Sequence, residues 1–166
     1  MDDSRLEKHT EPYCLSKAEH FTHPVNDGKT LSLLASDYKD PQAVSYMSVV
    51  RRLTPLEAER LQGFPDNWTN IGEWVDTKGK KHKDADSPRY KALGNSIALP
   101  FWEWLAERMT AYYDRPTTMA SLFDGIGGFP LVFSRHGCTP VWASEIEEFP
   151  IAVTKIHFPE DREGKD

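Results

Sequence analysis

A glycine-rich segment in the last third of the chain constrains its fold more than any other feature. The segment Ser121-Leu-Phe-Asp-Gly-Ile-Gly-Gly-Phe129 follows the start of an apolar run that predicts a strand over 120–123, and it precedes a predicted helix over 131–136. A second predicted strand over 139–143 comes next, and Glu145 marks its end. The order strand, glycine turn, helix, strand predicts an α/β fold that contains a β-α-β unit.

The same segment also suggests a ligand. Gly125, Gly127 and Gly128 can let the backbone approach a bound molecule closely, although their G-x-G-G spacing differs from that of a dinucleotide fingerprint. Glu145 lies about twenty positions beyond the turn, where a carboxylate can accept hydrogen bonds from both hydroxyls of a ribose. The pattern favours a ligand with a ribose and no pyrophosphate. An ordinary strand-to-helix turn followed by a chance glutamate is the alternative.

Composition limits the classes of protein that the chain can represent. It has 166 residues, two cysteines and a formal net charge of −6. Such a charge argues against a basic surface that binds nucleic acid over the whole chain, so we expect any DNA contact to be local. Cys14 and Cys138 cannot build a disulfide framework, and no apolar run approaches the ~20 residues of a membrane helix. We expect a cytoplasmic protein without membrane contact.

Upstream of the glycine segment, two helices are predicted. Thr54 as N-cap, Pro55 at the first position, Glu57 as the second half of a capping box and Gly63 as the stop predict a helix over 54–62. After Gly94-Asn-Ser96, apolar residues recur at spacings of three and four, which predicts a helix with one buried stripe. The members of that stripe are Ile97, Phe101, Trp104, Leu105, Met109 and Tyr112.

Two other segments have strand-like patterns. Residues 43–50 predict one short strand, with Val44, Tyr46 and Val50 on one face and Met47 and Val49 on the other. Residues 72–88 predict an exposed hairpin with a lysine-rich tip. The lysines are either phosphate contacts or an ordinary solvated face: Lys78, Lys80, Lys81 and Lys83.

Four segments together resemble a known family. Residues 120–129 and 142–146 are similar to the first and second signature motifs of DNA cytosine-5 methyltransferases of phage and bacterial type, and residues 51–65 and 89–98 are similar to the ninth and tenth. The resemblance covers about residues 30–160. It implies a partial Rossmann-like methyltransferase fold with part of the small target-recognition domain, S-adenosylmethionine as cofactor and DNA as partner.

The resemblance also implies roles for individual residues. Phe123 would contact adenine, the turn 124–128 would leave room for the methionine part of the cofactor, Glu145 would bind the ribose hydroxyls, and Ile146 would cover the adenine. The tenth-motif turn would bring Asn95 and Ser96 to the amino and carboxylate groups, although by themselves these two read as the cap of the following helix. The implied cofactor-binding set is Phe123, Asp124, Gly125, Ile126, Gly127, Gly128, Glu145, Ile146, Asn95 and Ser96.

The residues that perform the family's chemistry are not found. That chemistry requires a cysteine thiolate that attacks a flipped-out cytosine, and the family's Pro-Cys, Glu-Asn-Val-like and Gln-x-Arg-x-Arg segments are missing from this sequence. Cys14 follows Tyr13, and Cys138 opens a predicted strand, where a small buried role is expected. We therefore assign no catalytic residue and expect no activity from the isolated chain. A complementing polypeptide or a homo-oligomer would complete the enzyme, and a noncatalytic cofactor- or partner-binding remnant is the alternative.

The order of the segments is also informative. The ninth and tenth motifs precede the first and second, which implies circular permutation and truncation. The predicted domains are 1–88 as the end of the recognition domain with the ninth-motif scaffold, 89–113 as the tenth-motif turn and helix, 114–118 as linker, and 119–166 as the first β-α-β unit. Residues 31–41 weakly resemble the end of the recognition region.

A metal site is the remaining alternative near the N-terminus. Cys14, His20 and His23 fall close together, but zinc sites need four ligands at recognisable spacing and no second pair exists. We predict no metal.

Overall fold

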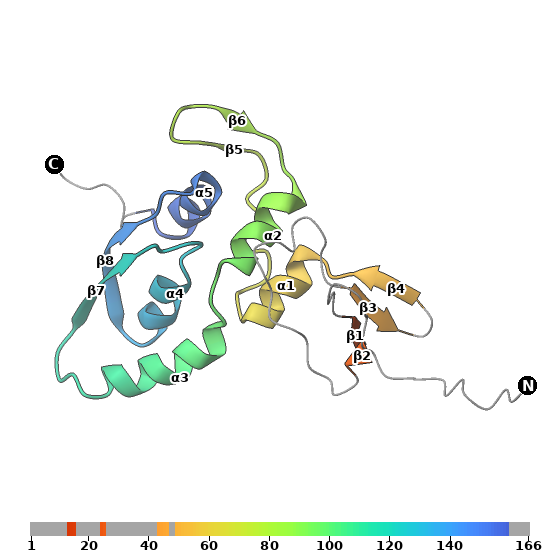
Figure 1. Cartoon of the computed structure of the whole chain (residues 1–166). Coiled ribbons are helices and arrows are strands. Elements are labelled where there is room, and N and C mark those ends of the chain that lie inside the picture. The colour runs from red at the N-terminus through yellow and green to blue at the C-terminus, as the bar shows by residue number, and fades with distance from the viewer. Residues whose placement is uncertain (1–12, 16–23, 26–42, 47–48, 160–166) are drawn as a thin grey trace, which may run out of the picture.

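The structure is a computed structural model that describes residues 13–15, 24–25, 43–46 and 49–159. Within these ranges, four strands precede the first helix, strands and helices are mixed in the rest of the chain, and the strands form three separate sheets (Figure 1). The segment 31–41 and the candidate ligands His20 and His23 lie outside the described residues.

The first sheet is antiparallel and has the strand order β2-β1-β3-β4. Its strands are β1 (Tyr13–Leu15), β2 (Pro24–Val25), β3 (Ala43–Tyr46) and β4 (Val49–Arg52). Ala43 pairs with Arg52 and Tyr46 pairs with Val49, so the chain reverses between β3 and β4. The prediction of a single strand over 43–50 is wrong, because both arms of a tight hairpin carry residues typical of strands and their pattern does not show the reversal.

Helix α1 (Pro55–Gln62) confirms the predicted capping. The hydroxyl of Thr54 accepts a hydrogen bond from the backbone N–H of Glu57 at 3.2 Å, and the carboxylate of Glu57 accepts one from the N–H of Thr54 at 2.9 Å. Gly63 ends the helix at a φ of 83°, in the region that favours glycine. A Cβ atom at Gly63 would lie 2.8 Å from Cδ of Pro100, so this glycine also permits close contact with the next long helix.

The predicted hairpin is present and is followed by a helix that was not predicted. Strands β5 (Trp74–Val75) and β6 (Lys81–His82) pair antiparallel. Helix α2 (Asp86–Gly94) follows. Its sequence lacks an apolar stripe of helical period, and it has only Ala92 and Leu93 buried. Packing against α1 stabilises α2, and a short window of sequence does not show that contact.

Helix α3 (Leu99–Thr110) is confirmed, but its predicted buried stripe is wrong. Phe101, Trp104, Met109 and Tyr112 are between 43% and 87% exposed, whereas Leu99 and Ala106 are buried. The helix carries apolar residues on more than one side, so their spacing alone does not reveal which side packs. The buried side faces the helix that follows the glycine turn.

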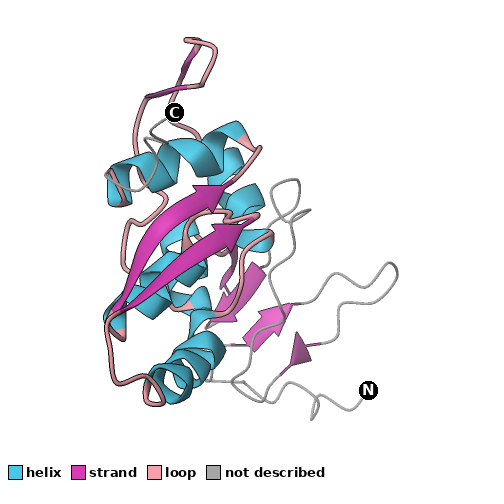
Figure 2. Cartoon of the chain, turned by 90° about the vertical axis from the view of Figure 1, so that its left-hand side faces the viewer, coloured by secondary structure: helices cyan, strands magenta, loops and turns pink. Residues whose placement is uncertain are grey.

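The last third of the chain contains the predicted β-α-β unit. Its elements are β7 (Thr117–Leu122), α4 (Gly128–Arg135) and β8 (Cys138–Ser144), followed by α5 (Glu148–His157). Strands β7 and β8 pair in parallel, and β7 begins within the segment 114–118 that was predicted as linker. Figure 2 looks onto the two strands with helices behind them. The Leu122 and Val141 side chains of this sheet are exposed.

One hydrophobic core connects the helices and the glycine turn. It combines residues from all five described helices with aromatic residues between α1 and β5. Its buried members are Ala58, Phe64, Trp68, Ala92, Leu93, Leu99, Ala106, Ile126, Val132, Phe149 and Val153. Because Ile126 belongs to this core, packing fixes the back of the glycine turn.

Candidate functional site

The glycine turn and Glu145 meet at the carboxyl ends of β7 and β8. The backbone N–H of Gly125 donates to Oε2 of Glu145 at 2.6 Å, and the N–H of Asp124 donates to the carbonyl of Ser144 at 3.0 Å. Ligands of open α/β sheets bind outside the carboxyl ends of parallel strands. The two features that the sequence singled out therefore lie together at the edge of the sheet where a ligand is expected.

The carboxylate of Glu145 accepts hydrogen bonds from several backbone N–H groups. Its Oε1 accepts hydrogen bonds from the N–H groups of Ile146 at 2.7 Å and Glu147 at 2.9 Å, just before α5 begins. With the bond from Gly125, three donors occupy a group that offers about four lone-pair positions. Glu145 thus holds the glycine turn and the start of α5 together and keeps about one position for a further donor.

The three glycines differ in what surrounds them. A Cβ atom at Gly127 would lie 2.8 Å from the ring of Phe158, and one at Gly128 would lie 3.1 Å from Cγ1 of Ile97. At Gly125, by contrast, nothing lies within 4 Å of that position. The space that we expected all three glycines to give to a ligand is open at Gly125, and at Gly127 and Gly128 the protein's own side chains fill it.

Two apolar side chains flank the Gly125–Glu145 contact in sequence and are exposed. Phe123 is 81% exposed and Ile146 is 82% exposed. Phe123 also has a φ of 53°, which is uncommon for a residue with a side chain and is frequent at ligand sites. Ile126 differs from both, because its side chain is fully buried. Of the sequence-predicted apolar residues, Phe123 and Ile146 are thus available to a flat apolar ligand group, and Ile126 supports the turn from behind.

The turn 94–97 lies beside the glycine turn, since Ile97 contacts Gly128. Asn95 ends α2, with its N–H donating to the carbonyl of Lys91 at 3.1 Å, and the residue at the N-cap of α3 is Ala98. The alternative in which Asn95 and Ser96 cap α3 is therefore wrong, because the unpredicted α2 ends there and separates them from α3. Neither side chain makes a hydrogen bond to a residue that the structure describes.

A cavity of about 520 Å³ lies between α2, the β5–β6 hairpin and the start of α5. Asn95 and Ile146 both line it, and Lys91 joins two of its walls through an ion pair with Glu147 at 2.9 Å. Its other walls are largely apolar: Trp74, Pro88, Ala92, Phe149 and Pro150. The lining of the cavity therefore contains Asn95 from the tenth-motif segment and Ile146 from the second-motif segment. Phe123 and the glycine turn lie outside this lining.

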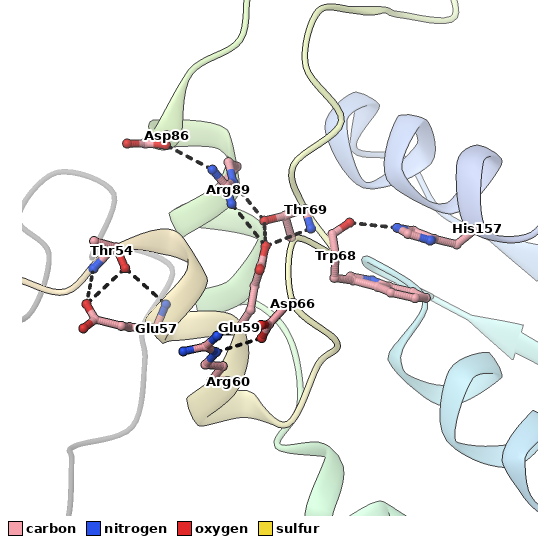
Figure 3. Close-up of polar contacts among 10 residues, drawn as sticks. All are labelled: Thr54, Glu57, Glu59, Arg60, Asp66, Trp68, Thr69, Asp86, Arg89 and His157. Atoms are coloured by element: carbon pink, nitrogen blue, oxygen red, sulfur yellow. Dashed lines mark hydrogen bonds and ion pairs between the residues drawn. The ribbon is translucent and has the colours of Figure 1, made fainter.

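Sequence reasoning missed Trp68, which supports the glycine turn from the other side. Its indole N–H donates to the carbonyl oxygen of Ile126 at 2.8 Å. The ring of His157 stacks on Trp68 at 3.6 Å between centroids, and its Nε2 lies 2.8 Å from the Trp68 carbonyl oxygen (Figure 3). A tryptophan three positions after the Gly-Phe-Pro that ends the ninth-motif segment was the available signal.

A buried polar cluster joins α1 to α2, as Figure 3 shows. Glu59 is fully buried, and its Oε1 accepts hydrogen bonds from both the N–H and the hydroxyl of Thr69. Arg89 lies 3.3 Å from the same oxygen and donates to the Thr69 hydroxyl at 3.0 Å. These contacts connect the ninth-motif helix to the tenth-motif helix and fix the direction from which the turn 94–97 approaches the glycine turn.

Cys138, the other candidate group, has a structural role. Cys138 is 8% exposed, and its sulfur accepts a hydrogen bond from the Thr117 hydroxyl at 3.2 Å, which fits the small buried role expected from sequence. No group of three or more potential metal ligands occurs among the described residues. The helices in the described ranges all fall short of the length and apolarity needed to cross a bilayer.

Comparison with known proteins adds independent information. A family model described as C-5 cytosine-specific DNA methylase matches residues 9–111, a range that includes the segments 51–65 and 89–98 and ends before the glycine turn. A DNA N-6-adenine-methyltransferase of Escherichia phage P1 is 38% identical in an alignment of 114 positions that covers 53% of this chain and 14% of that protein.

Two type II methyltransferases are also similar. M2.BsuMI of Bacillus subtilis is 30% identical over 104 residues, or 61% of this chain and 23% of that protein. M.Sau3AI of Staphylococcus aureus is 46% identical over 52 residues, or 31% of this chain and 10% of that protein. The chain therefore spans less than a quarter of the length of each of these relatives.

Proposed function

The chain belongs to the family of C-5 cytosine-specific DNA methylases, and on this premise we propose that it forms part of an enzyme that transfers a methyl group from S-adenosylmethionine to C5 of cytosine in DNA. Its contribution is one side of the cofactor site and the scaffold around it. The similar protein from phage P1 is named as an adenine methyltransferase, so the choice of base belongs to the proposal.

The observation that carries the proposal is the contact between Gly125 and Glu145. It places an open glycine and a carboxylate at one end of a parallel strand pair, beside the exposed side chains of Phe123 and Ile146. The carboxylate would take a ribose hydroxyl, and the two apolar side chains would lie against the adenine. Asn95 and Ser96, whose side chains have no described partner, would take the amino and carboxylate groups.

The residues present fit such a cofactor, provided that Glu145 accepts one ribose hydroxyl or releases the N–H of Gly125 to accept two. Glu145 keeps about one lone-pair position, which suits one ribose hydroxyl. Accepting a second hydroxyl would displace the N–H of Gly125 from Oε2. The bound cofactor supplies an activated methyl group, while the role of this chain is to bind and orient it. The buried Ile126, Gly127 and Gly128 would shape the turn, and Asp124 would position it through the bond to Ser144.

Other parts of the enzyme would come from elsewhere. The thiol of Cys138 is buried. We propose that a complementing polypeptide provides the nucleophile and the remaining strands of a Rossmann-like sheet, and that the motif order reflects circular permutation. In this arrangement residues 1–88 belong to the recognition domain and its scaffold, 89–113 form the tenth-motif unit, and 119–166 begin the cofactor domain. A noncatalytic remnant that still binds the cofactor is the second candidate.

Calorimetric titration with S-adenosylmethionine tests the site. We expect binding by the wild-type chain and at least about tenfold weaker binding by Glu145→Ala, equivalent to about 1.4 kcal/mol. Glu107→Ala is the matched control, since Glu107 is an exposed glutamate on α3, away from the strand ends. Absence of heat from the wild type, or equal affinity in Glu145→Ala and wild type, would contradict the proposed site.

A methyl-transfer assay separates the two candidates. The purified chain alone should leave DNA unmodified, and addition of a polypeptide that carries the family's Pro-Cys segment should restore transfer if the chain is an enzyme component. Nucleoside analysis of the product then distinguishes 5-methylcytosine from N6-methyladenine. Transfer by the chain alone would show that the nucleophile has been misassigned.

A further inference from the structure

The hairpin of residues 74–82 carries a basic surface that the cofactor site does not explain. It lies at the top of Figure 1. Residues 78–83 contain four lysines, all of them exposed: Lys78, Lys80, Lys81 and Lys83. None of these ammonium groups forms an ion pair with another residue in the described ranges. We call these four residues the lysine tip.

Internal contacts order the backbone that presents the lysine tip. Oδ1 of Asp76 accepts hydrogen bonds from the N–H groups of Lys78 at 3.0 Å and Lys80 at 2.8 Å. Its Oδ2 lies 2.9 Å from Nε2 of His82, and the ring of His82 stacks on Trp74 with 4.1 Å between centroids. The turn is therefore stabilised without any help from the lysine side chains, which stay free to contact a partner at little further cost in backbone ordering.

A second set of contacts fixes the hairpin to the cofactor side of the molecule. The N–H and hydroxyl of Thr77 donate to the two carboxylate oxygens of Glu148 at 2.8 Å and 2.6 Å. Trp74 packs edge-on against Phe149 with 5.5 Å between ring centroids. Glu148 and Phe149 form the first turn of α5, a few residues after Glu145. The lysine tip is thus held in a defined position relative to the proposed cofactor site.

We propose that the lysine tip binds the phosphates of duplex DNA and helps to hold the substrate beside the cofactor site. This inference rests on the proposed function for the identity of the partner. The whole chain has a net charge of −6, so four lysines within six residues are a local exception of the kind that a confined phosphate contact requires. Lysine acts as a point charge toward phosphate, so the contact would position the duplex without reading its sequence.

The salt dependence of DNA binding tests the inference. Fluorescence anisotropy with a labelled duplex measures the affinity of the full chain from about 20 to about 200 mM salt, and each phosphate neutralised contributes about 0.9 to the slope of log K against log salt. We expect Lys80→Ala/Lys81→Ala to reduce the slope by about 1.8, and replacement of the whole lysine tip by alanine to reduce it by up to about 3.6. Affinity at the lowest salt should fall in the same order.

A matched control separates a local contact from a change in net charge. Arg115→Ala/Lys155→Ala also removes two positive charges from exposed positions, in the loop between α3 and β7 and on α5. This variant should keep the wild-type slope. An equal loss in both double variants, no salt-dependent binding by the wild type, or equally tight binding of polyglutamate would overturn the inference, since each excludes a local contact with duplex phosphate.

Cofactor titration of the same variants separates this inference from the proposed function. The lysine tip does not line the cavity or touch Glu145, so its variants should bind S-adenosylmethionine as the wild type does. Loss of DNA binding with unchanged cofactor affinity supports the lysine tip. If the chain binds the cofactor but the lysine-tip variants bind DNA as the wild type does, this inference alone is overturned. If the lysine-tip variants lose DNA affinity but the wild-type chain does not bind the cofactor, the proposed function alone is overturned.

Discussion

Trp68 donates its indole N–H to the carbonyl oxygen of Ile126, 2.8 Å away, in a buried contact between residues 58 positions apart. Ile126 is in the middle of the glycine turn, one residue after the N–H that binds Glu145. The segment after α1 therefore supports the proposed cofactor site through a single directed hydrogen bond. Removing that bond should affect both stability and ligand binding.

Trp68→Phe tests this support. Phenylalanine keeps an aromatic ring in the core but cannot donate to Ile126, so we expect a loss of about 1–3 kcal/mol from the unsatisfied buried carbonyl. Urea unfolding measures the stability, and calorimetry measures the affinity for S-adenosylmethionine, which should fall because the turn is less well held. Trp104→Phe is the control, since Trp104 is half exposed on α3. Equal behaviour of the two variants would contradict a specific role for Trp68.

Alanine at Gly125 and at Gly127 should have different effects. Both glycines have positive φ, 58° and 82°, so either substitution costs about 1–2 kcal/mol of backbone strain. At Gly127 the added Cβ would also meet the ring of Phe158, so this variant should be clearly less stable in urea unfolding. At Gly125 the Cβ enters open space on the proposed ligand side, so cofactor affinity should fall more than stability does. Equal stability of the two variants would be the contrary result.

The buried pair of Glu59 and Arg89 should contribute strongly to the fold. Arg89→Met keeps the volume of the side chain but leaves the Glu59 carboxylate buried without its cation, and breaking such a pair typically costs about 3–5 kcal/mol. Chemical denaturation measures the loss. Arg60→Met removes the exposed ion pair between Asp66 and Arg60 of α1, the helix that also carries Glu59, and it should change stability little. A small effect of Arg89→Met would show that the contact with Thr69 alone is enough for Glu59.

The carboxylate of Glu57 makes the stability of the fold depend on pH. The hydrogen bond from Arg51 is the largest cause that lowers the pKa of Glu57, from its ordinary 4.5 to about 2. A pKa that is lower in the folded state means that the ionised form stabilises the fold. This contribution is complete above the unfolded pKa and is lost as pH falls from about 4.5 toward 2.

Glu57→Gln isolates that contribution. Glutamine can still close the capping box but does not titrate, so the variant should lose less stability than the wild type when the pH falls through this range. Urea unfolding at several pH values measures the difference. The carboxylates of Asp66 and Asp76 also have lowered pKa values, from their bonds with Arg60 and His82, and act equally in both proteins. Parallel pH profiles would contradict the assignment.

Local chemistry made some elements predictable. Thr54, Pro55 and Glu57 specify the start of α1 through capping that involves only neighbouring residues, and the structure confirms it. The β-α-β unit was equally accessible, because its strands and glycine turn carry signals within a few residues of one another. The contact of Gly125 with Glu145 agrees with the rule that parallel strands share their carboxyl ends, although the sequence did not predict the contact itself.

Features that depend on distant contacts were not predictable. Helix α2 is weakly marked in sequence and is held by packing, so the role of Asn95 at its end was misread as a cap of α3. The buried side of α3 depends on its contact with α4, and the support of the glycine turn by Trp68 joins residues far apart in sequence. The reversal between β3 and β4 was missed because residues typical of strands continue through both arms, and the pairing of the arms shows only in the structure.

In the proposed site, the N–H of Gly125 and the cofactor compete for the same carboxylate oxygen of Glu145. If the contact must open for a second ribose hydroxyl, the apparent dissociation constant equals the intrinsic one divided by the fraction of molecules that are open. A contact that favours the closed state by about 1.4 kcal/mol would weaken apparent affinity about tenfold. A partner that draws the glycine turn away from Glu145 would raise the affinity for the cofactor without touching it, so assembly and cofactor loading would become cooperative.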